Sequence, residues 1–493
     1  MTIISLKAED GSEVEFVKKD PKQGGVKDVY FSPDRSYVVA FFRKPLDANG
    51  LERMERLVGP YRQGIFGQQG AEYWKNLFSW PTSIVKHEKL VGIVAPTYFS
   101  NFFFPAGTTL EGAEKEGKWF ASAKNFNRFV PPSEKGNLLG YLKICLTLSR
   151  AVRRLHAAGL AHSDLSYKNC LVDPSTGGAC IIDIDGLVVP GLFPPDVVGT
   201  PDFIAPEVVA TMSLNKDDPL RKLPCRETDQ HALAVLIYLY LFHRHPLRGA
   251  KVFSQDSDVQ ETKEMGEGAL FIEHPTDKSN RFKITNNDKD FLPWVDTEKL
   301  PYTIMGPYLK ACFDKAFIDG LHDPSERPSA DDWEEALVKT LDLIQPCSNS
   351  KCVKGWYVFA NTTRPVCPYC GKVFKGQLPV LDFYSSRDGQ KFLPDNHRLM
   401  VYNDQYLYLW HVKRNLFPNE KLSENEKKPV GYFSFFKKRW IFINQTLETL
   451  ADITNGKQKP IAIGSYVEMV NGLQLRLSSE PNGRLVNVSL VTV

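Results

Sequence analysis

The stretch 161-AHSDLSYKN-169 decides how the rest of this sequence is interpreted. It holds His162, Asp164 and Asn169 in the order H-x-D-L-x-x-x-N. Immediately before it, residues 138–159 repeat apolar side chains at steps of three and four, which predicts a long amphipathic helix ending at a glycine. The stretch is therefore expected to be an ordered loop at the end of a helix that packs into a core.

Three side chains of this region form a set that phosphoryl transfer requires. The stretch 181-IIDIDG-186 adds Asp183 behind an apolar pair. The chemistry needs one carboxylate that orients the attacking hydroxyl, and a second carboxylate and an Asn that hold Mg²⁺ on the nucleotide phosphates. Asp164, Asp183 and Asn169 supply these groups if a β-hairpin brings them into one cleft. Each motif alone would also suit an ordinary turn, but the pair at this spacing favours the chemical interpretation.

A third motif, 199-GTPDFIAPE-207, closes the segment that follows Asp183. With this motif, residues 15–345 resemble the eukaryotic-like Ser/Thr protein kinases in the order and spacing of their motifs. Small-molecule kinases of the aminoglycoside and choline type share the first loop but lack this segment and a late Arg, so the resemblance favours a protein kinase. The resemblance implies that Thr200 contacts the catalytic loop and that Glu207 pairs with Arg327. It also implies that Asp229 opens the apolar helix that anchors the helical lobe.

The resemblance also implies an ATP site in the N-terminal lobe, where the sequence departs from the family. The glycine-rich turn is represented only by Gly24 and Gly25. Phe42 stands where the family carries its phosphate-binding Lys. We expect Lys44 to take that role because Ala40, Phe42 and Lys44 would share one strand face.

Two further residues belong to this predicted ATP site. Arg43 is the second candidate for the phosphate-binding cation. Glu72 is expected to support that cation, with Glu55 as the alternative. The competing interpretation of all these charges is a solvated surface.

The segment between Asp183 and Glu207 contains one hydroxyl side chain, Thr200. Ser163 replaces the Arg that in the resembling family pairs with an activation-loop phosphate. These two features together predict an activity that does not depend on phosphorylation of that segment. Ser166 stands where many kinases carry a Lys, and Lys168 follows two residues later.

Four of the nine cysteines form one cluster of the pattern C-x4-C-x14-C-x2-C. Two pairs of thiolates are what a structural, tetrahedral Zn²⁺ takes, and the segment 346–377 resembles a zinc ribbon. The competing interpretation is four unrelated core cysteines. A net charge of +3 gives no support for nucleic-acid binding. The expected ligands are Cys347, Cys352, Cys367 and Cys370.

Residues 378–493 alternate apolar and polar side chains over several short runs, which predicts an all-β domain, a sandwich or a barrel. Hairpin turns are expected at Asn471-Gly472 and Asn482-Gly483. The domain loosely resembles forkhead-associated sandwiches, but no Arg-Ser-His loop triplet is present. A β interaction module of unknown partner is therefore the preferred interpretation.

Taken together, we expect an α+β chain with a bilobal protein-kinase-like domain over 1–345, followed by the ribbon and the β domain. The N-lobe would span about 1–100 and the C-lobe about 137–345. The arrangement resembles bacterial kinases of tellurite-resistance and stress operons. That resemblance implies ATP, Mg²⁺ and structural Zn²⁺ as cofactors and ligands, autophosphorylation, and a protein substrate.

The same resemblance implies a von Willebrand A-type protein and a metal-dependent Ser/Thr phosphatase as partners. The first residues lack the basic and then apolar pattern of a secretory signal, and the longest apolar run, 232–242, is short for a membrane span. We therefore expect a cytoplasmic protein without membrane contact. The alternative function is a pseudokinase scaffold that binds partners or nucleotide without turnover.

Overall fold

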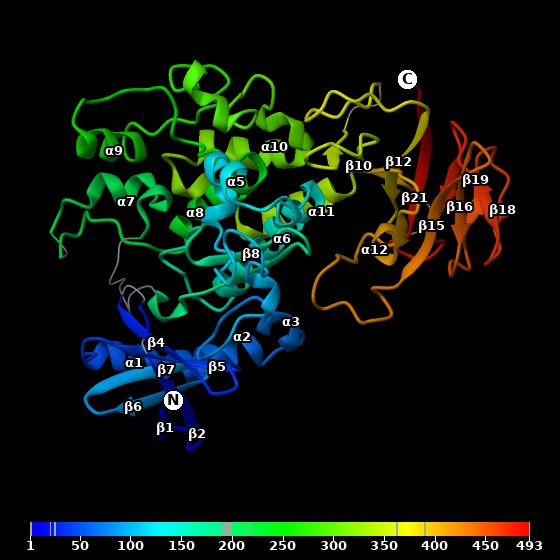
Figure 1. Cartoon of the computed structure of the whole chain (residues 1–493). Coiled ribbons are helices and arrows are strands. Elements are labelled where there is room, and N and C mark those ends of the chain that lie inside the picture. Colours follow the sequence, from blue (N-terminus) through cyan, green and yellow to red (C-terminus); the bar gives the residue numbers. More distant parts are fainter. Residues whose placement is uncertain are drawn as a thin grey trace. The chain divides into compact units, whose positions relative to one another are not determined.

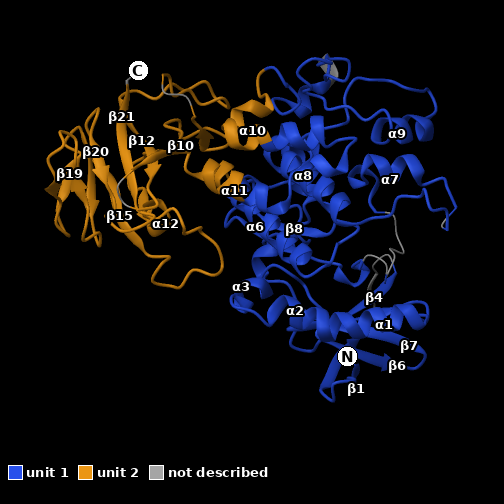
Figure 2. Cartoon of the chain, turned by 180° about the vertical axis from the view of Figure 1, so that it is seen from behind, with its two compact units in different colours: residues 1–136, 140–298, 312–334 blue, residues 137–139, 299–311, 335–493 orange. Residues whose placement is uncertain are grey.

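The chain folds into two compact units, which Figure 2 colours separately. The first comprises residues 1–136, 140–298 and 312–334, and the second comprises 137–139, 299–311 and 335–493. The computed structural model describes residues 2–19, 21–23, 26–189, 192, 199–215, 217–360, 363–388 and 391–492. Helices and sheets are mixed along the chain, as the sequence predicted.

A five-stranded antiparallel sheet in the order β3-β4-β5-β7-β6 forms the N-terminal lobe of the first unit (Figure 1). Aromatic and β-branched residues, which favour strands, fill it, and Val39 and Phe41 pack in a buried cluster with Phe16 of the hairpin β1–β2. The strands predicted around 28–32 and 37–43 are confirmed. The bounds are β1 (Thr2–Lys7), β2 (Glu13–Lys18), β3 (Lys22–Gln23), β4 (Lys27–Phe31), β5 (Tyr37–Phe42), β6 (Ser83–His87) and β7 (Leu90–Pro96).

Three short α-helices lie between β5 and β6 in the chain, the first two joined by a π-helical turn (Leu57–Tyr61). They are α1 (Ala48–Arg56), α2 (Arg62–Phe66) and α3 (Ala71–Lys75). The sequence predicted only the third. It missed α1 because the first turn of the helix contains Asn49-Gly50, an ordinary turn signal. The Asp47 carboxylate accepts a hydrogen bond from the Gly50 N–H (2.7 Å) and caps the helix.

The helical lobe is built around α6 (Leu138–Ala157) and α8 (Arg226–Phe242). In α8 every residue from Thr228 to Phe242 is buried, which is the place of a helix that is apolar all round, as predicted for 232–242. No helix in the described ranges is both long and apolar enough to cross a membrane. The other helices are α4 (Lys118–Ala121), α5 (Ala123–Arg128), α7 (Pro206–Thr211), α9 (Ser257–Met265), α10 (Gly306–Asp314), α11 (Ala330–Leu341) and α12 (Leu409–Val412).

A small hairpin follows the loop 161–169. Strands β8 (Cys170–Asp173) and β9 (Gly178–Ile181) pair antiparallel, with Cys170 opposite Ile181. The open end of the hairpin therefore holds both Asn169 and the segment that leads into Asp183. This is the hairpin that the sequence required between the three polar side chains.

The second unit is rich in sheet, as predicted. It contains the pair β10–β11, a six-stranded sheet in the order β13-β12-β21-β20-β17-β18 and a four-stranded sheet in the order β14-β15-β16-β19. The four-cysteine segment and these sheets belong to one compact unit, and the finer division at 346 and 378 stays a prediction. The bounds are β10 (Ile344–Pro346), β11 (Trp356–Val358), β12 (Gln377–Ser385), β13 (Leu393–Met400), β14 (Tyr406–Tyr408), β15 (Pro429–Phe436), β16 (Arg439–Asn444), β17 (Ala451–Asp452), β18 (Lys459–Pro460), β19 (Tyr466–Glu468), β20 (Gln474–Arg476) and β21 (Arg484–Thr492).

Candidate functional site

The Asp164 carboxylate is fixed by side chains from both sides of the site. Thr200 donates to its Oδ1 twice, from the backbone N–H (2.7 Å) and from the hydroxyl (2.8 Å). Asn169 Nδ2 donates to its Oδ2 (2.9 Å) and to the Asp164 carbonyl (2.8 Å). Four hydrogen bonds thus hold one carboxylate and its backbone, so that its direction is set before any substrate arrives.

The loop that carries Asp164 is attached to the buried helix α8. The Asp229 carboxylate accepts hydrogen bonds from the backbone N–H groups of His162 (2.7 Å) and Ser163 (3.2 Å). His162 Nε2 in turn lies 3.1 Å from the Ile182 carbonyl, just before Asp183. Ser163 has φ 67°, a left-handed conformation that these contacts hold in place. Asp229, predicted only by resemblance, therefore lies where it can orient the loop.

A cavity of about 520 Å³ connects the predicted polar residues. We call it the Asp164 cavity. It is lined by residues of the loop 161–169, by residues of the segment 183–186, which we call the acidic turn, by the end of β5 and by residues of α1. Asp183 takes a left-handed conformation there, with φ 59°, and its side chain is 53% exposed. The polar residues that line the Asp164 cavity include Asp164, Asn169, Asp183 and Asp185.

A half-buried cation, Lys27 on β4, contacts Asp183. Its Nζ lies 2.9 Å from Asp183 Oδ1 and also contacts Asp185 Oδ1. Burial opposes the charged ammonium, but the two carboxylates raise the pKa of Lys27 above its usual range. Burial likewise works against the charge of Asp183, yet Lys27 holds the pKa of that carboxyl below its usual range. Lys27, Asp183 and Asp185 therefore form one charged cluster.

The two predicted cations lie at the rim of the same cavity. Arg43 and Lys44 line it, but β5 ends at Phe42, so the alternation of strand faces does not extend to Lys44. Pro45 follows Lys44 and supplies no N–H for a sheet ladder. Arg43 Nε donates to Asp28 Oδ1 (2.8 Å). Arg43 and Lys44 are both exposed to solvent.

Glu72 does not reach this cluster. Its carboxylate is 85% exposed and pairs with Lys75 on the same helix (2.6 Å). Glu55, the alternative, is exposed on α1, where Arg53 and Met54 face the Asp164 cavity instead. Among the described residues, the carboxylates that contact Lys27 here are therefore Asp183 and Asp185. Gly24 and Gly25 lie outside the described residues.

Lys27 and Asp185 had no role in the sequence prediction, although one signal pointed to the lysine. In the β4–β5 hairpin Phe31 pairs with Val38 and Lys27 with Phe42. Directly opposite residues of an antiparallel pair point to the same side. Pairing the residues of this hairpin outward from its turn would thus have predicted that Lys27 lies opposite Phe42, the position where the family carries its phosphate-binding Lys.

A bidentate ion pair fixes the end of the segment that follows Asp183. Arg327 donates from both terminal nitrogens to the two oxygens of Glu207, at 2.8 and 2.7 Å. Its Nε donates to the Gly320 carbonyl. The structure thus brings together the Glu and the Arg that the resemblance named.

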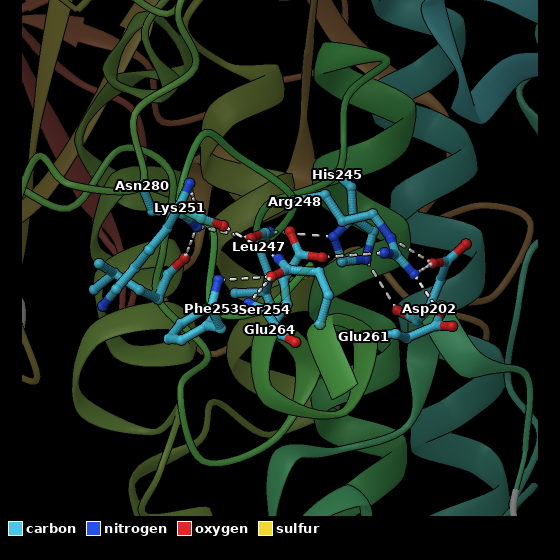
Figure 3. A network of polar contacts seen from close by, with 12 residues as sticks. Asp202, His245, Leu247, Arg248, Lys251, Phe253, Ser254, Glu261, Glu264 and Asn280 are labelled. Atoms are coloured by element: carbon cyan, nitrogen blue, oxygen red, sulfur yellow. Dashed lines mark hydrogen bonds and ion pairs between the residues drawn. The ribbon is translucent and has the colours of Figure 1, made fainter. Parts of the chain in front are cut away.

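A second cavity, of about 500 Å³, has Tyr167 and Lys168 of the loop 161–169 among its lining residues. Lys168 thus lines this cavity, whereas Ser166 is buried and its hydroxyl lies 3.3 Å from the Thr200 hydroxyl oxygen, to which it can donate. Beside it, Arg248 binds three carboxylates (Figure 3). These belong to Asp202, Glu261 and Glu264.

The four predicted zinc ligands converge in the second unit. All four sulfur atoms lie within 4.8 Å of one another, with 3.5 Å between the sulfurs of Cys347 and Cys370 and 3.7 Å between those of Cys352 and Cys367. A tetrahedral site with Zn–S bonds of about 2.3 Å needs sulfurs about 3.8 Å apart. The donor set therefore fits Zn²⁺.

Comparisons with known proteins give limited likeness. No protein-family model matches the chain. A stretch of 103 residues is 35% identical to Death-associated protein kinase dapk-1 of Caenorhabditis elegans, and this is 20% of the chain and 6% of that protein. The chain thus matches only a small part of that curated relative.

Solved structures of Toxoplasma gondii proteins are also similar. A specific rhoptry antigen kinase domain is 15% identical with a TM-score of 0.40, over 69% of this chain and 86% of the other. ROP2, titled a virulence factor with a protein-kinase fold and no enzymatic activity, is 14% identical with a TM-score of 0.39, over 69% and 84%. Similarity at this level transfers neither activity nor inactivity.

Proposed function

We propose that this chain is an ATP- and Mg²⁺-dependent protein kinase that transfers the γ-phosphate to Ser or Thr hydroxyls, including its own. The observation that supports this best is the convergence of Asp164, Asn169 and Asp183 on one cavity, with Asp164 held by four hydrogen bonds. The architecture, a sheet lobe followed by a helical lobe, is protein-kinase-like and agrees with it.

In the proposed reaction, Asp164 orients the substrate hydroxyl and accepts its hydrogen bond. Thr200 and Asn169 keep that carboxylate from rotating. Asn169 and Asp183 would hold Mg²⁺, since both offer oxygen ligands and Asp183 is partly exposed to the cavity. The bound metal would neutralise charge that develops on the phosphates.

Phosphate transfer from γ-³²P-labelled ATP by the full chain tests the proposal. The acceptors are the chain itself and generic Ser/Thr substrates, and Asp164→Ala and Asp164→Asn are compared with wild type. We expect both variants to lower the rate by roughly 10²–10⁴-fold, the usual contribution of a positioned acid or base. Asp277→Ala, a surface aspartate in the first unit, is the control.

Two results would contradict a kinase. The first is a wild-type rate equal to that of Asp164→Ala. The second is no incorporation by wild type with either Mg²⁺ or Mn²⁺ on any acceptor, including itself. ATP binding without transfer would then favour the pseudokinase scaffold.

The zinc site and the cellular context are proposals of the same rank. Cys347, Cys352, Cys367 and Cys370 would hold a structural Zn²⁺ with no open position for chemistry. Following the resemblance to kinases of stress operons, we propose a bacterial stress-signalling role, a cytoplasmic location, and a von Willebrand A-type protein and a phosphatase as candidate partners.

A further inference from the structure

In the N-terminal sheet a lysine lies on β4, opposite the position on β5 where the family resemblance led us to expect one. On β5, Phe42 occupies the position at which the sequence led us to look for a phosphate-binding lysine. On β4, Lys27 lies directly opposite Phe42 in the antiparallel register. Opposite residues project to the same face of a sheet, so a lysine at 27 and a lysine at 42 would serve the same space.

The contacts of Lys27 point that ammonium at the acidic turn. Nζ contacts Asp183 and Asp185, and its side chain is 12% exposed. It also lies 5.6 Å from the centre of the Phe42 ring. A lysine ammonium has three N–H donors. The two carboxylates, both of which line the Asp164 cavity, take two of these donors, which leaves one for a further acceptor.

Asp185 explains why a lysine that is largely shielded from solvent is stable here. Its side chain is also only 12% exposed, and a buried charge is tolerated when it is paired. Asp183 has a second task in the proposed reaction as a metal ligand. Asp185 has none, so it remains the partner of Lys27 whichever state Asp183 is in.

We propose that Lys27 is the cation that binds the phosphates of ATP, and that Asp185 is the residue that positions it. This inference rests on the proposed kinase function. It assigns to a β4 residue the role that the sequence gave to Lys44 or Arg43. Those two side chains are exposed, and Arg43 is already bonded to Asp28.

The test measures MgATP affinity by calorimetry and phosphate transfer in the full chain for Lys27→Met, Lys44→Met and Arg43→Met. We expect Lys27→Met to weaken ATP binding by roughly 10- to 100-fold, the range of a charged hydrogen bond, and to lose more than either rival variant. Lys86→Met, on β6 of the same sheet and 57% exposed, should match wild type.

A double variant that moves the lysine to the neighbouring strand distinguishes the proposed role from the mere loss of the ion pairs of Lys27 with Asp183 and Asp185. In Lys27→Met/Phe42→Lys the lysine is moved to β5, directly opposite its original position, so it lies on the same face of the sheet. We expect this double variant to regain ATP affinity relative to Lys27→Met. Thermal melting of each variant shows whether it is folded.

Asp185→Asn tests the positioning role. It should raise the KM for ATP more than it lowers kcat, and Asp185→Glu should recover part of the loss because it restores the negative charge. A loss confined to thermal stability, with unchanged KM, would show that Asp185 is only structural.

The outcomes separate this inference from the proposed function. If wild type binds ATP and Lys27→Met binds equally well, or Lys44→Met or Arg43→Met loses more, the Lys27 assignment is overturned and the kinase proposal stands. If wild type binds ATP without transferring phosphate, the kinase proposal fails, and weaker binding by Lys27→Met still supports the assignment. If wild type does not bind ATP, both are overturned.

Discussion

At the scale of single residues, the site is defined by how Asp164 is held. Its Oδ1 receives two hydrogen bonds from Thr200, and its Oδ2 receives one from Asn169. A hydroxyl that donates to a carboxylate both stabilises the charge and fixes the rotamer. Thr200 should therefore act on the rate through Asp164 and not through ATP.

Thr200→Val removes the hydroxyl donor and keeps the side-chain shape and the backbone N–H. Because a hydrogen bond to a charged group contributes roughly 1.5–3 kcal/mol, we expect kcat to fall by roughly 10-fold or more. The KM for ATP should change little, since the hydroxyl does not line the Asp164 cavity. Thr200→Ser should retain most of the activity, and equal losses in Ser and Val would contradict the assigned hydrogen bond.

At the scale of elements, the segment that follows α8 connects Asp202 with helix α9 through hydrogen bonds and ion pairs. His245 Nδ1 accepts a hydrogen bond from the Leu247 N–H (3.2 Å), so Nε2 is the protonated nitrogen that donates to the Asp202 carbonyl (2.9 Å). Arg248 joins the Asp202 carboxylate to Glu261 and Glu264 (Figure 3). The neutral imidazole is thus built into this network.

This network predicts a pH dependence of stability. Burial lowers the pKa of His245 to about 4 from 6.5, despite the attraction of Asp202. Between pH 6.5 and 4 the unfolded chain takes up a proton that the folded chain does not, so the free energy of unfolding falls as pH falls through this range. Because the residue is only partly buried, the expected loss is about 2 kcal/mol.

Chemical denaturation at several pH values checks this expectation. His245→Asn keeps an acceptor for the Leu247 N–H and removes the titrating group, so its free energy of unfolding should fall less steeply between pH 6.5 and 4. His322→Gln, an exposed histidine, is the control. An unchanged slope in His245→Asn would show that the histidine is not responsible.

At the scale of the whole molecule, the chain divides into two units with different sources of stability. The first has the buried helix α8 at its core. The second contains the strand pair β10–β11, two larger sheets and the cluster of four cysteines. Metal binding to such a cluster is coupled to folding, so it should stabilise the second unit in particular.

We expect the purified chain to contain one zinc ion, the capacity of a four-cysteine site, measured by elemental analysis. Cys370→Ser should lower zinc affinity by more than roughly 100-fold, since it removes a direct ligand. In calorimetry of the full chain, a zinc chelator should lower the melting temperature of one transition and leave ATP binding by the first unit intact. Absence of zinc, or melting that is insensitive to the chelator, would contradict the site.

The sequence by itself determined the parts of the site that are close along the chain. Asp164, Asn169 and Asp183 are separated by one loop and one short hairpin, so covalent connection and local pairing bring them together. The buried character of α8 and the gathering of the four cysteines in one cluster were likewise predictable, because apolar periodicity and ligand spacing are local properties.

The tertiary structure decided which basic residue faces the acidic turn. That choice depends on the register of β4 against β5, which places Lys27 opposite Phe42, and on the end of β5 at Phe42, which leaves Lys44 outside the strand. It also placed Glu72 on the surface. Register and strand ends are set by packing between segments, and a shift of one residue reverses every side chain, so a motif spacing alone could not select the lysine.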